Sequence, residues 1–507
     1  MRLRLAVACA VLVAIAATRP PVLDEEVYLD IAAQLHGHPW RPYDWWRPMQ
    51  PWGDEPAPDA FLFAHPPLHL LWVSLWTALL PWGPALRLAV ATPFALLLGA
   101  AAGDLLHRES PRAQRGAWLW WASPILWLAL QSGLMIDLGV VALSTAALAA
   151  SLRAREEPRR VGWEWAEGAL LGLACSWKYP ALILAFVLTL DALRSGRRPW
   201  RAALGFGLIF GGVQLGLAAL YGAPHLLHVL TNAAQISRGP LLGRAIGAVA
   251  RLGVAVSPIL WLTLHERWRI AVVAVAAPIT LIALQNGAYT LVDHGLMALF
   301  LIGGLSALGV AIAALTRPGR SWLYGAWALA VVIGVILGHN YASGRYLLPA
   351  VLPLVILGAE QLSRRALILG VLPWLGLSVA TSIAEHRQAQ AAVEVVGQLT
   401  ASAEGAAPGV FTGEWTARWA LRGAGWRFVS PGAALPPGTL YAEPSHSSPA
   451  ARPTGLVPVA VFESADTFSF RVGDPERGVG LHAETLGALP LGFGHGPLER
   501  LTLYESP

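Results

Sequence analysis

A single lysine stands among the basic residues of this chain. Lys178 lies in CSWKYPALIL, between two apolar runs, whereas the other 35 of the 36 Lys and Arg residues are arginines. An ammonium group is a compact point charge suited to holding an anion such as a phosphate. The alternative is an interfacial anchor, with its stem in lipid and its charge among headgroups. Because arginine is used for anchors elsewhere in this composition, the phosphate interpretation is favoured.

Carboxylates and an arginine accompany this lysine on what we predict to be the same side of a membrane. Asp24 and Glu25 follow the first apolar run, Asp137 lies in QSGLMIDLGV, and Arg345 lies in GHNYASGRYLLP. A carboxylate can accept the proton of an attacking hydroxyl, and cations can stabilise a phosphate as its charge grows. The set predicts a site for a phosphorylated, membrane-borne substrate.

Each of these residues also has a structural interpretation. Asp24 could be the N-cap of a helix, and Asp137 could be a loop residue or the cap of a helix over 138–152. His65, which precedes two prolines, could be an ordinary loop residue. Arg345 could anchor a helix end among aromatic side chains.

The elements that must position these residues are membrane helices. The 507 residues are 55% hydrophobic and 13% charged, with a mean hydropathy of +0.52, whereas soluble domains carry about a quarter charged residues. Apolar segments of spanning length recur to about residue 383, so the chain is a polytopic helical protein of the lipid bilayer. Its net charge of +5 comes from short arginine loops, so no nucleic-acid partner is expected.

Arginine-rich loops predict the orientation. Assigned to the cytoplasm, they alternate with loops poor in net positive charge, at 107–115, 153–160, 194–201, 265–269, 316–320 and 363–365. The pattern predicts about thirteen spans in a bacterial inner (cytoplasmic) membrane, with the N-terminus in the cytoplasm. The first apolar run is expected to remain as a span rather than to be cleaved as a signal peptide. Residues 66–82, interrupted by prolines, could cross fully or form a shorter segment that does not.

Two parts are predicted along the chain. Residues 1–383 form the membrane module, with an external loop over 19–64 that begins with the interfacial helix DEEVYLDIAAQL. Residues 384–507 form a small periplasmic α+β domain, with a helix at HRQAQAAVEVVGQL and strands at GVFTG, WRFVSPG, GTLYAEP, LVPVAVFES and FSFRV. The fold class is therefore mainly α, a transmembrane helical bundle with a small C-terminal α+β domain.

Tryptophans and prolines fill the external loop HGHPWRPYDWWRPMQPWGDEPAPDAF, which predicts a cover at the membrane interface. The same loop carries His36, His38, Asp44, Asp54 and Asp59, which lack a recognised ligand spacing, and the sequence has no Asp-x-Asp motif. No metal or other cofactor is required by the sequence, although a divalent cation is compatible with it.

The order of these motifs resembles the GT-C superfamily of membrane glycosyltransferases. The closest branches are the bacterial aminoarabinose transferases and the protein O-mannosyltransferase-like enzymes. The resemblance is carried by Asp24-Glu25-x-x-Tyr28, AHPPLHLLWVSLW, the later Asp137, WKYPALIL, GRYLLPAVLPL and, in the C-terminal part, GEWTARWALRGAGWRFV. It implies transfer of a sugar from a polyprenyl-phosphate donor, with inversion, to an extracytoplasmic acceptor such as a glycolipid, a glycan or a protein hydroxyl.

The resemblance also implies roles for single residues. Asp24 would be the general base with Glu25 as a second candidate, and the donor phosphate would be held by Lys178 and Arg345. His65 and Asp137 would shape the pocket or help to hold a metal. The full set of expected pocket residues is Tyr28, His65, Asp137 and Tyr346.

Two other functions remain open from the sequence. The first is a transporter or flippase for a lipid or a lipid-linked sugar, and the second is a non-catalytic, lipid-binding relative. A transport pathway predicts paired polar residues at mid-membrane depth, whereas the distinctive polar residues here lie at predicted outer helix ends. The sequence determines neither the donor sugar nor the acceptor.

Overall fold

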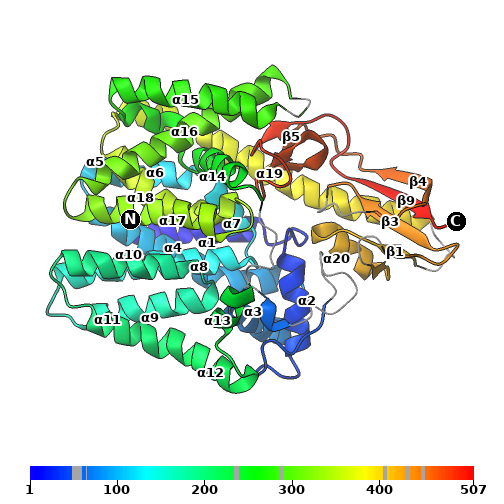
Figure 1. Ribbon diagram of the computed structural model, residues 1–507, viewed down its shortest axis with the longest axis horizontal. Coiled ribbons are helices and arrows are strands. Elements are labelled where there is room, and N and C mark those ends of the chain that lie inside the picture. The colour runs from blue at the N-terminus through cyan, green and yellow to red at the C-terminus, as the bar shows by residue number, and fades with distance from the viewer. Residues whose placement is uncertain are drawn as a thin grey trace.

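The computed structural model consists of a large helical part and a smaller part built from short strands (Figure 1). The structure describes residues 1–47, 60–63, 65–232, 239–285, 287, 289–402, 408–429, 433–446 and 452–507. The strands lie at one end of the helical part, where the C-terminus is also found (Figure 1).

The helical part is formed by consecutive helices joined by short connections. Their bounds are α1 (Arg2–Ile15), α2 (Glu25–Leu35), α3 (Leu68–Leu79), α4 (Pro84–His107), α5 (Pro111–Gln114), α6 (Gly116–Trp121), α7 (Pro124–Gln131), α8 (Ile136–Glu156), α9 (Gly162–Trp177), α10 (Ala181–Arg194), α11 (Trp200–Phe206), α12 (Gly212–Tyr221), α13 (His225–Asn232), α14 (Leu241–Val256), α15 (Glu266–Leu284), α16 (Leu291–Leu315), α17 (Arg320–Gly338), α18 (Leu348–Ala359) and α19 (Arg364–Ser402).

Helix length and composition indicate a multi-pass membrane protein. A span needs about 20 apolar residues. Within the described ranges, seven helical segments are long and apolar enough: Pro84–His107, Ile136–Glu156, Trp200–Tyr221, Glu266–Leu284, Leu291–Leu315, Arg320–Gly338 and Arg364–Ser402.

The count of about thirteen spans stays a prediction, because further apolar helices are shorter than a full crossing requires. The segment 66–82 is one of them. It forms α3, a helix of 12 residues that ends before Pro81. That length corresponds to the expected alternative in which this segment does not cross the whole bilayer.

Close helix packing relies on glycine at a few crossings. A Cβ atom built on Gly99 of α4 would lie 2.5 Å from the backbone oxygen of Leu5 in α1, and one on Gly103 would lie 2.6 Å from the Cα of Arg2. Neither position has room for a side chain, so the backbones of α1 and α4 approach each other closely.

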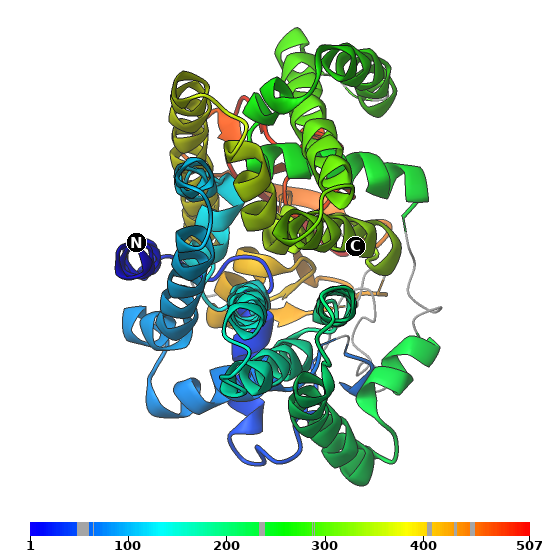
Figure 2. The same ribbon diagram turned by 90° about the vertical axis from the view of Figure 1, so that its left-hand side faces the viewer.

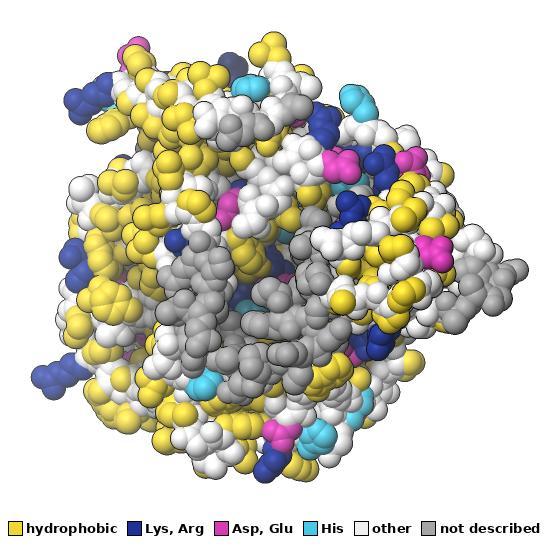
Figure 3. Space-filling view, turned by 45° about the vertical axis from the view of Figure 1, so that its right-hand side comes forward, with side chains coloured by type: hydrophobic (Ala, Val, Ile, Leu, Met, Phe, Trp, Pro, Cys, Tyr) yellow, Lys and Arg dark blue, Asp and Glu magenta, His cyan; other side chains and the backbone are white. Residues whose placement is uncertain are grey.

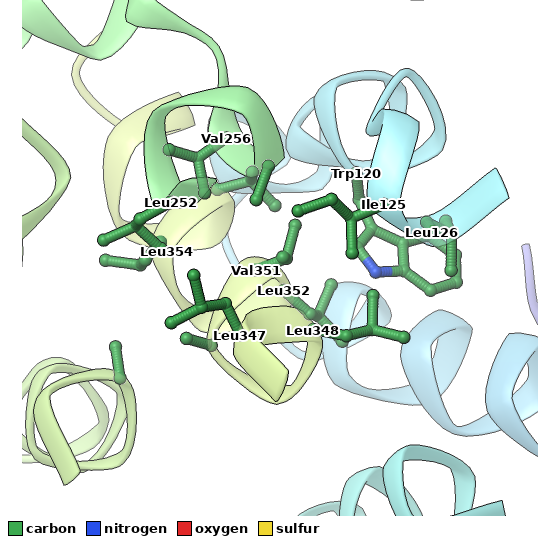
Figure 4. Close-up of a cluster of buried hydrophobic side chains, with 14 of the residues drawn as sticks. Trp120, Ile125, Leu126, Leu252, Val256, Leu347, Leu348, Val351, Leu352 and Leu354 are labelled. Atoms are coloured by element: carbon green, nitrogen blue, oxygen red, sulfur yellow. The ribbon is translucent and has the colours of Figure 1, made fainter. Parts of the chain in front are cut away.

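A buried apolar cluster holds the segment that carries Arg345. The short helix η5 (Gly344–Leu347) runs directly into α18. Leu347 and Leu348 at this junction are buried, and they lie in one cluster with Leu126 of α7 and Leu252 of α14 (Figure 4). This packing fixes the backbone on either side of the arginine.

The C-terminal part contains a five-stranded mixed sheet in the order β2-β1-β3-β9-β4. Strand β1 pairs in parallel with β2 and β3, while β9 is antiparallel to β3 and β4. Two small antiparallel pairs, β5 with β8 and β6 with β7, complete it, together with helix α20 (Trp415–Gly423). The strands are β1 (Val410–Phe411), β2 (Arg427–Phe428), β3 (Leu440–Pro444), β4 (Val457–Glu463), β5 (Phe470–Arg471), β6 (Gly473–Asp474), β7 (Val479–Gly480), β8 (Gly492–Phe493) and β9 (Arg500–Glu505).

The mainly helical fold with a small C-terminal mixed sheet is confirmed. Strands β1 to β5 fall at the five stretches expected to be strands, although the end of WRFVSPG lies outside the described residues. The helix expected at the start of the external loop is present as α2, and its position at the membrane interface stays a prediction. The division at 383/384 stays a prediction, and α19 runs through that position as one helix of 39 residues.

Candidate functional site

Four charged residues from distant parts of the chain meet at the ends of helices. Asp24 occupies the N-cap position of α2, and Arg345 lies in η5. Asp137 is in the first turn of α8, and Lys178 is the C-cap of α9. All four belong to the set that the sequence predicts.

The four side chains form a continuous chain of alternating charge. Arg345 Nη2 donates to Asp24 Oδ2 at 2.9 Å, and Arg345 Nε lies 3.6 Å from Asp137 Oδ2. The other oxygen of Asp137, Oδ1, accepts a hydrogen bond of 2.6 Å from Lys178 Nζ. Each carboxylate therefore faces at least one cation, and the four formal charges cancel.

This geometry shows whether the two aspartates act as helix N-caps. Asp24 does occupy an N-cap, yet among the described residues its side chain makes no capping hydrogen bond and instead binds Arg345. Asp137 lies inside α8, after the N-cap residue Met135, and its carboxylate is directed to Lys178. Both carboxylates are thus committed to cations rather than to helix termini.

Aromatic side chains surround the two cations. The Lys178 ammonium lies 4.2 Å from the ring centroid of Tyr346, and the Arg345 guanidinium lies 5.3 Å from the same ring. The Tyr346 hydroxyl donates a hydrogen bond of 3.0 Å to the Tyr341 hydroxyl. The His339 ring stacks on the Tyr346 ring, with centroids 4.1 Å apart. Cation–π contacts of this kind stabilise a charge that water does not reach.

The remaining predicted pocket residues, Tyr28 and His65, lie side by side. Their ring centroids are 6.5 Å apart, and Tyr28 also packs edge-on against His69 at 4.6 Å. Burial, and next the nearby Lys178 ammonium, lower the pKa of His65 well below its usual range. This shift favours the neutral imidazole of His65 over a third cation beside Lys178 and Arg345.

Two buried polar atoms between the ion pairs remain open to a ligand or a water. Within the described part of the chain, Asp137 Oδ2 and Arg345 Nε make no hydrogen bond, because their separation of 3.6 Å exceeds the limit for one. Buried polar atoms normally have partners. A polar guest that approaches Asp137 and Arg345 would supply them.

A small cavity borders these atoms. It has a volume of about 20 Å³, which is room for about one water molecule. Asp137 and Arg345 form its polar wall, apolar side chains of α7 form another, and His482 of the C-terminal part closes it. Seen with the strand-bearing end turned forward, the surface is hollowed near its centre, and basic side chains are visible inside (Figure 3). A sugar would require the charged cluster to open.

Glu25 lies apart from this cluster. Its side chain is fully buried, and Oε1 accepts hydrogen bonds from Arg87 Nη1 at 2.9 Å and from the backbone N–H of Leu134 at 3.1 Å. Its Oε2 accepts from the backbone N–H of Val22 at 3.0 Å. Both oxygens are occupied, so Glu25 has structural partners, and of the two adjacent carboxylates only Asp24 contacts the charged cluster.

A second buried ion pair that the sequence did not reveal joins the helical part to the C-terminal part. Arg19 binds Glu385 of α19, and His482 Nε2 lies 2.9 Å from the same carboxylate. His482 also borders the small cavity. Arg19 and Glu385 are separated by 366 positions, and neither they nor His482 belong to a recognisable motif, so no signal in the sequence could have grouped them.

Metal-ligand candidates do not assemble. Among the described residues, no group of three or more His, Cys, Asp or Glu side chains is placed to hold a metal ion. In the external loop, His38 Nε2 pairs with the backbone oxygen of Asp44, and the Asp44 carboxylate accepts from Arg41. Asp54 and Asp59 lie outside the described residues.

Comparison with solved structures finds a distant likeness of fold. No protein-family model and no curated protein matches the chain. The structure is similar to ArnT from Cupriavidus metallidurans in the apo state, with 18% identity, a TM-score of 0.41 and coverage of 85% of this chain and 86% of that one. It is also similar to ArnT from the same organism bound to undecaprenyl phosphate, with 18% identity, a TM-score of 0.44 and coverage of 83% and 84%.

A third similar structure is the oligosaccharyltransferase of Archaeoglobus fulgidus in complex with zinc and sulfate. The identity is 16%, the TM-score is 0.46, and the match covers 85% of this chain and 62% of that one. At TM-scores below 0.5 the likeness is remote, and the function is argued below from the residues of this chain.

Proposed function

We propose that this protein is an integral membrane glycosyltransferase that moves a sugar from a polyprenyl-phosphate donor to an extracytoplasmic acceptor, with inversion. The observation that carries the proposal is the alternating chain Asp24–Arg345–Asp137–Lys178 at helix ends, beside an apolar-lined cavity. It brings a partly accessible carboxylate and two cations into one place, which are the groups that this transfer needs.

Asp24 is the proposed general base. Its side chain is 36% exposed, whereas those of Asp137 and Lys178 are each 5% exposed. An acceptor hydroxyl can therefore reach Asp24 more easily than the second carboxylate. As the hydroxyl oxygen bonds to the anomeric carbon, its proton passes to Asp24 and the bond from that carbon to the phosphate oxygen breaks.

Arg345 and Lys178 are the proposed holders of the donor phosphate. The leaving polyprenyl phosphate takes both electrons of the broken bond, so its negative charge grows during the reaction. Cations already fixed in place stabilise that charge without reorganisation. The rings of Tyr346 and Tyr341 and the buried junction of η5 with α18 keep Arg345 in position.

The closed geometry suggests how binding is coupled to the base. Arg345 is bound to Asp24, and the cavity beside it holds about one water molecule. A phosphate that replaces Asp24 as the partner of Arg345 would release the Asp24 carboxylate for the acceptor while Arg345 stays in place. Donor binding would then precede activation of the acceptor hydroxyl.

Topology and substrates follow as parts of the same proposal. The charged cluster lies on the side of the membrane that carries the C-terminal part, which we assign to the periplasmic face of a bacterial inner membrane. The cluster is built from residues at helix ends rather than at mid-helix, which favours chemistry at one surface over a passage through the bilayer.

The test is donor binding and turnover of Asp24→Asn in purified protein with a panel of synthetic polyprenyl-phosphate sugars. We expect turnover to fall by roughly 10²- to 10⁴-fold, the usual contribution of a general base, while donor binding is kept. Asp44→Asn is the matched control, because that carboxylate also lies in the external loop and pairs with an arginine.

Full turnover by Asp24→Asn would overturn the assignment of the base. Absence of binding of every donor to the wild-type protein would overturn the glycosyltransferase itself and would place a transporter first.

A further inference from the structure

A groove lies at the end of the helical part away from the C-terminal strands, the end that Figure 2 faces. It runs between α6 and the beginning of α19 and has a volume of about 440 Å³. Small-molecule sites usually have volumes of about 300–1,000 Å³. The groove shares no lining residue with the charged cluster or with the small cavity beside it.

Two arginines supply the charge of this groove. Arg115 and Arg364 line it, and within the described residues neither side chain forms an ion pair, a hydrogen bond or a ring contact. Other arginines bind the acidic residues Asp104, Glu109 and Glu156 on neighbouring helix ends. Glu360, at the end of α18, forms no ion pair with either groove arginine within the described residues. The groove therefore contains two arginines without an ion-pair partner.

The rest of the lining is apolar, and part of it faces outward, whereas Leu367 is buried at 6% exposure. Trp118 is 64% exposed and Leu372 is 63% exposed, and between them α19 adds Leu367, Ile368 and Val371 to the wall. These side chains belong to α6 and to a candidate membrane span, so acyl chains rather than water cover them. Tryptophan is typical of the depth at which headgroups meet hydrocarbon.

We propose that this groove binds one anionic phospholipid. Its phosphate is held between Arg115 and Arg364, and an acyl chain lies along α19 from Leu367 to Leu372. Arginine binds phosphate through charge-assisted hydrogen bonds, and basic pockets between membrane helices bind anionic headgroups. Because the phosphate contacts both arginines, it links the start of α19 to α6. This site is independent of the proposed sugar transfer.

The experiment is native mass spectrometry of the full-length protein in detergent, titrated with phosphatidylglycerol or with phosphatidylcholine of the same acyl chains. The test variant is Arg115→Gln/Arg364→Gln. The control is Arg112→Gln/Arg365→Gln, which removes the same charge from the same two helices at exposed positions that do not line the groove. All four arginines are exposed, so both variants should fold.

Wild-type protein should retain one phosphatidylglycerol and discriminate against phosphatidylcholine. An arginine near an anionic lipid is worth roughly fivefold in affinity, so the test variant should lose about 30-fold, and the control should lose less than a few-fold. Equal losses in both variants would overturn the proposal in favour of diffuse surface attraction. Equal retention of the two lipids by wild-type protein would overturn it as well, and so would displacement of the lipid by equimolar inorganic phosphate.

Discussion

Removal of both partners of the Lys178–Asp137 pair should cost much less stability than the sum of the two single removals. The two side chains are 5% exposed and 2.6 Å apart. Loss of one member of a buried pair leaves an uncompensated charge, which typically costs about 3–5 kcal/mol. In Lys178→Met the stranded carboxylate keeps Arg345 at 3.6 Å, and in Asp137→Asn the ammonium keeps the ring of Tyr346 at 4.2 Å. Each partial compensation places the expected loss near the lower end, about 3 kcal/mol.

The double variant Lys178→Met/Asp137→Asn carries no buried charge at either position. Additive losses would total roughly 6 kcal/mol, whereas we expect about 3 kcal/mol or less, so the coupling free energy should be at least about 3 kcal/mol. The assay is unfolding of the purified protein in mixed micelles by sodium dodecyl sulfate, followed by circular dichroism. A double-variant loss equal to the sum of the two single losses would refute the reasoning, because the groups would then not interact.

Two further predictions concern other ionisable groups. Glu25→Gln should lower the free energy of unfolding by roughly 3 kcal/mol, since it breaks a fully buried ion pair with Arg87. The variant protein that does fold should keep its turnover. Normal stability with no turnover would instead indicate that Glu25 takes part in the reaction. In the C-terminal part, burial alone would lower the pKa of His446, but the nearby carboxylates of Asp474 and Glu499, 3.6 Å and 3.5 Å from its ring nitrogens, outweigh it and raise the pKa from 6.5 to about 10. The stabilisation from a raised pKa is complete below pH 6.5 and is lost as pH rises to about 10. Thermal unfolding should therefore show a loss of stability across that range that is absent in His446→Gln, and identical profiles would contradict it.

The sequence located the members of the charged cluster but could not pair them. Asp24 and Arg345 are separated by 321 positions, and nothing local to either indicates the other. Glu25 was a candidate because it adjoins Asp24. Successive residues of a helix point about 100° apart, so only one of the two faces Arg345, and the other is buried against Arg87. The choice depends on how α2 is rotated, which depends on tertiary packing.

The helical class, the short strands and the helix at the start of the external loop were predictable because each rests on local pattern. The boundary at 383/384 rests on a change of composition. A change of composition marks where contact with the apolar part of the membrane ends. It does not mark where the hydrogen bonds of a helix end, and α19 continues past this boundary to Ser402. His482 was beyond prediction, because a histidine in a turn-rich segment has no periodicity that links it to Arg19 and Glu385.

Because α19 is one uninterrupted helix, a rotation introduced at any point along it is transmitted to everything that follows. At 1.5 Å per residue its 39 residues extend for about 58 Å, from the arginine groove at one end to the sheet at the other. Adding one residue to a helix advances everything beyond it by 1.5 Å and turns it by about 100°. Natural variation in the length of this helix is therefore constrained to whole turns, since any other change would rotate Glu385 away from Arg19 and reorient the sheet relative to the helices.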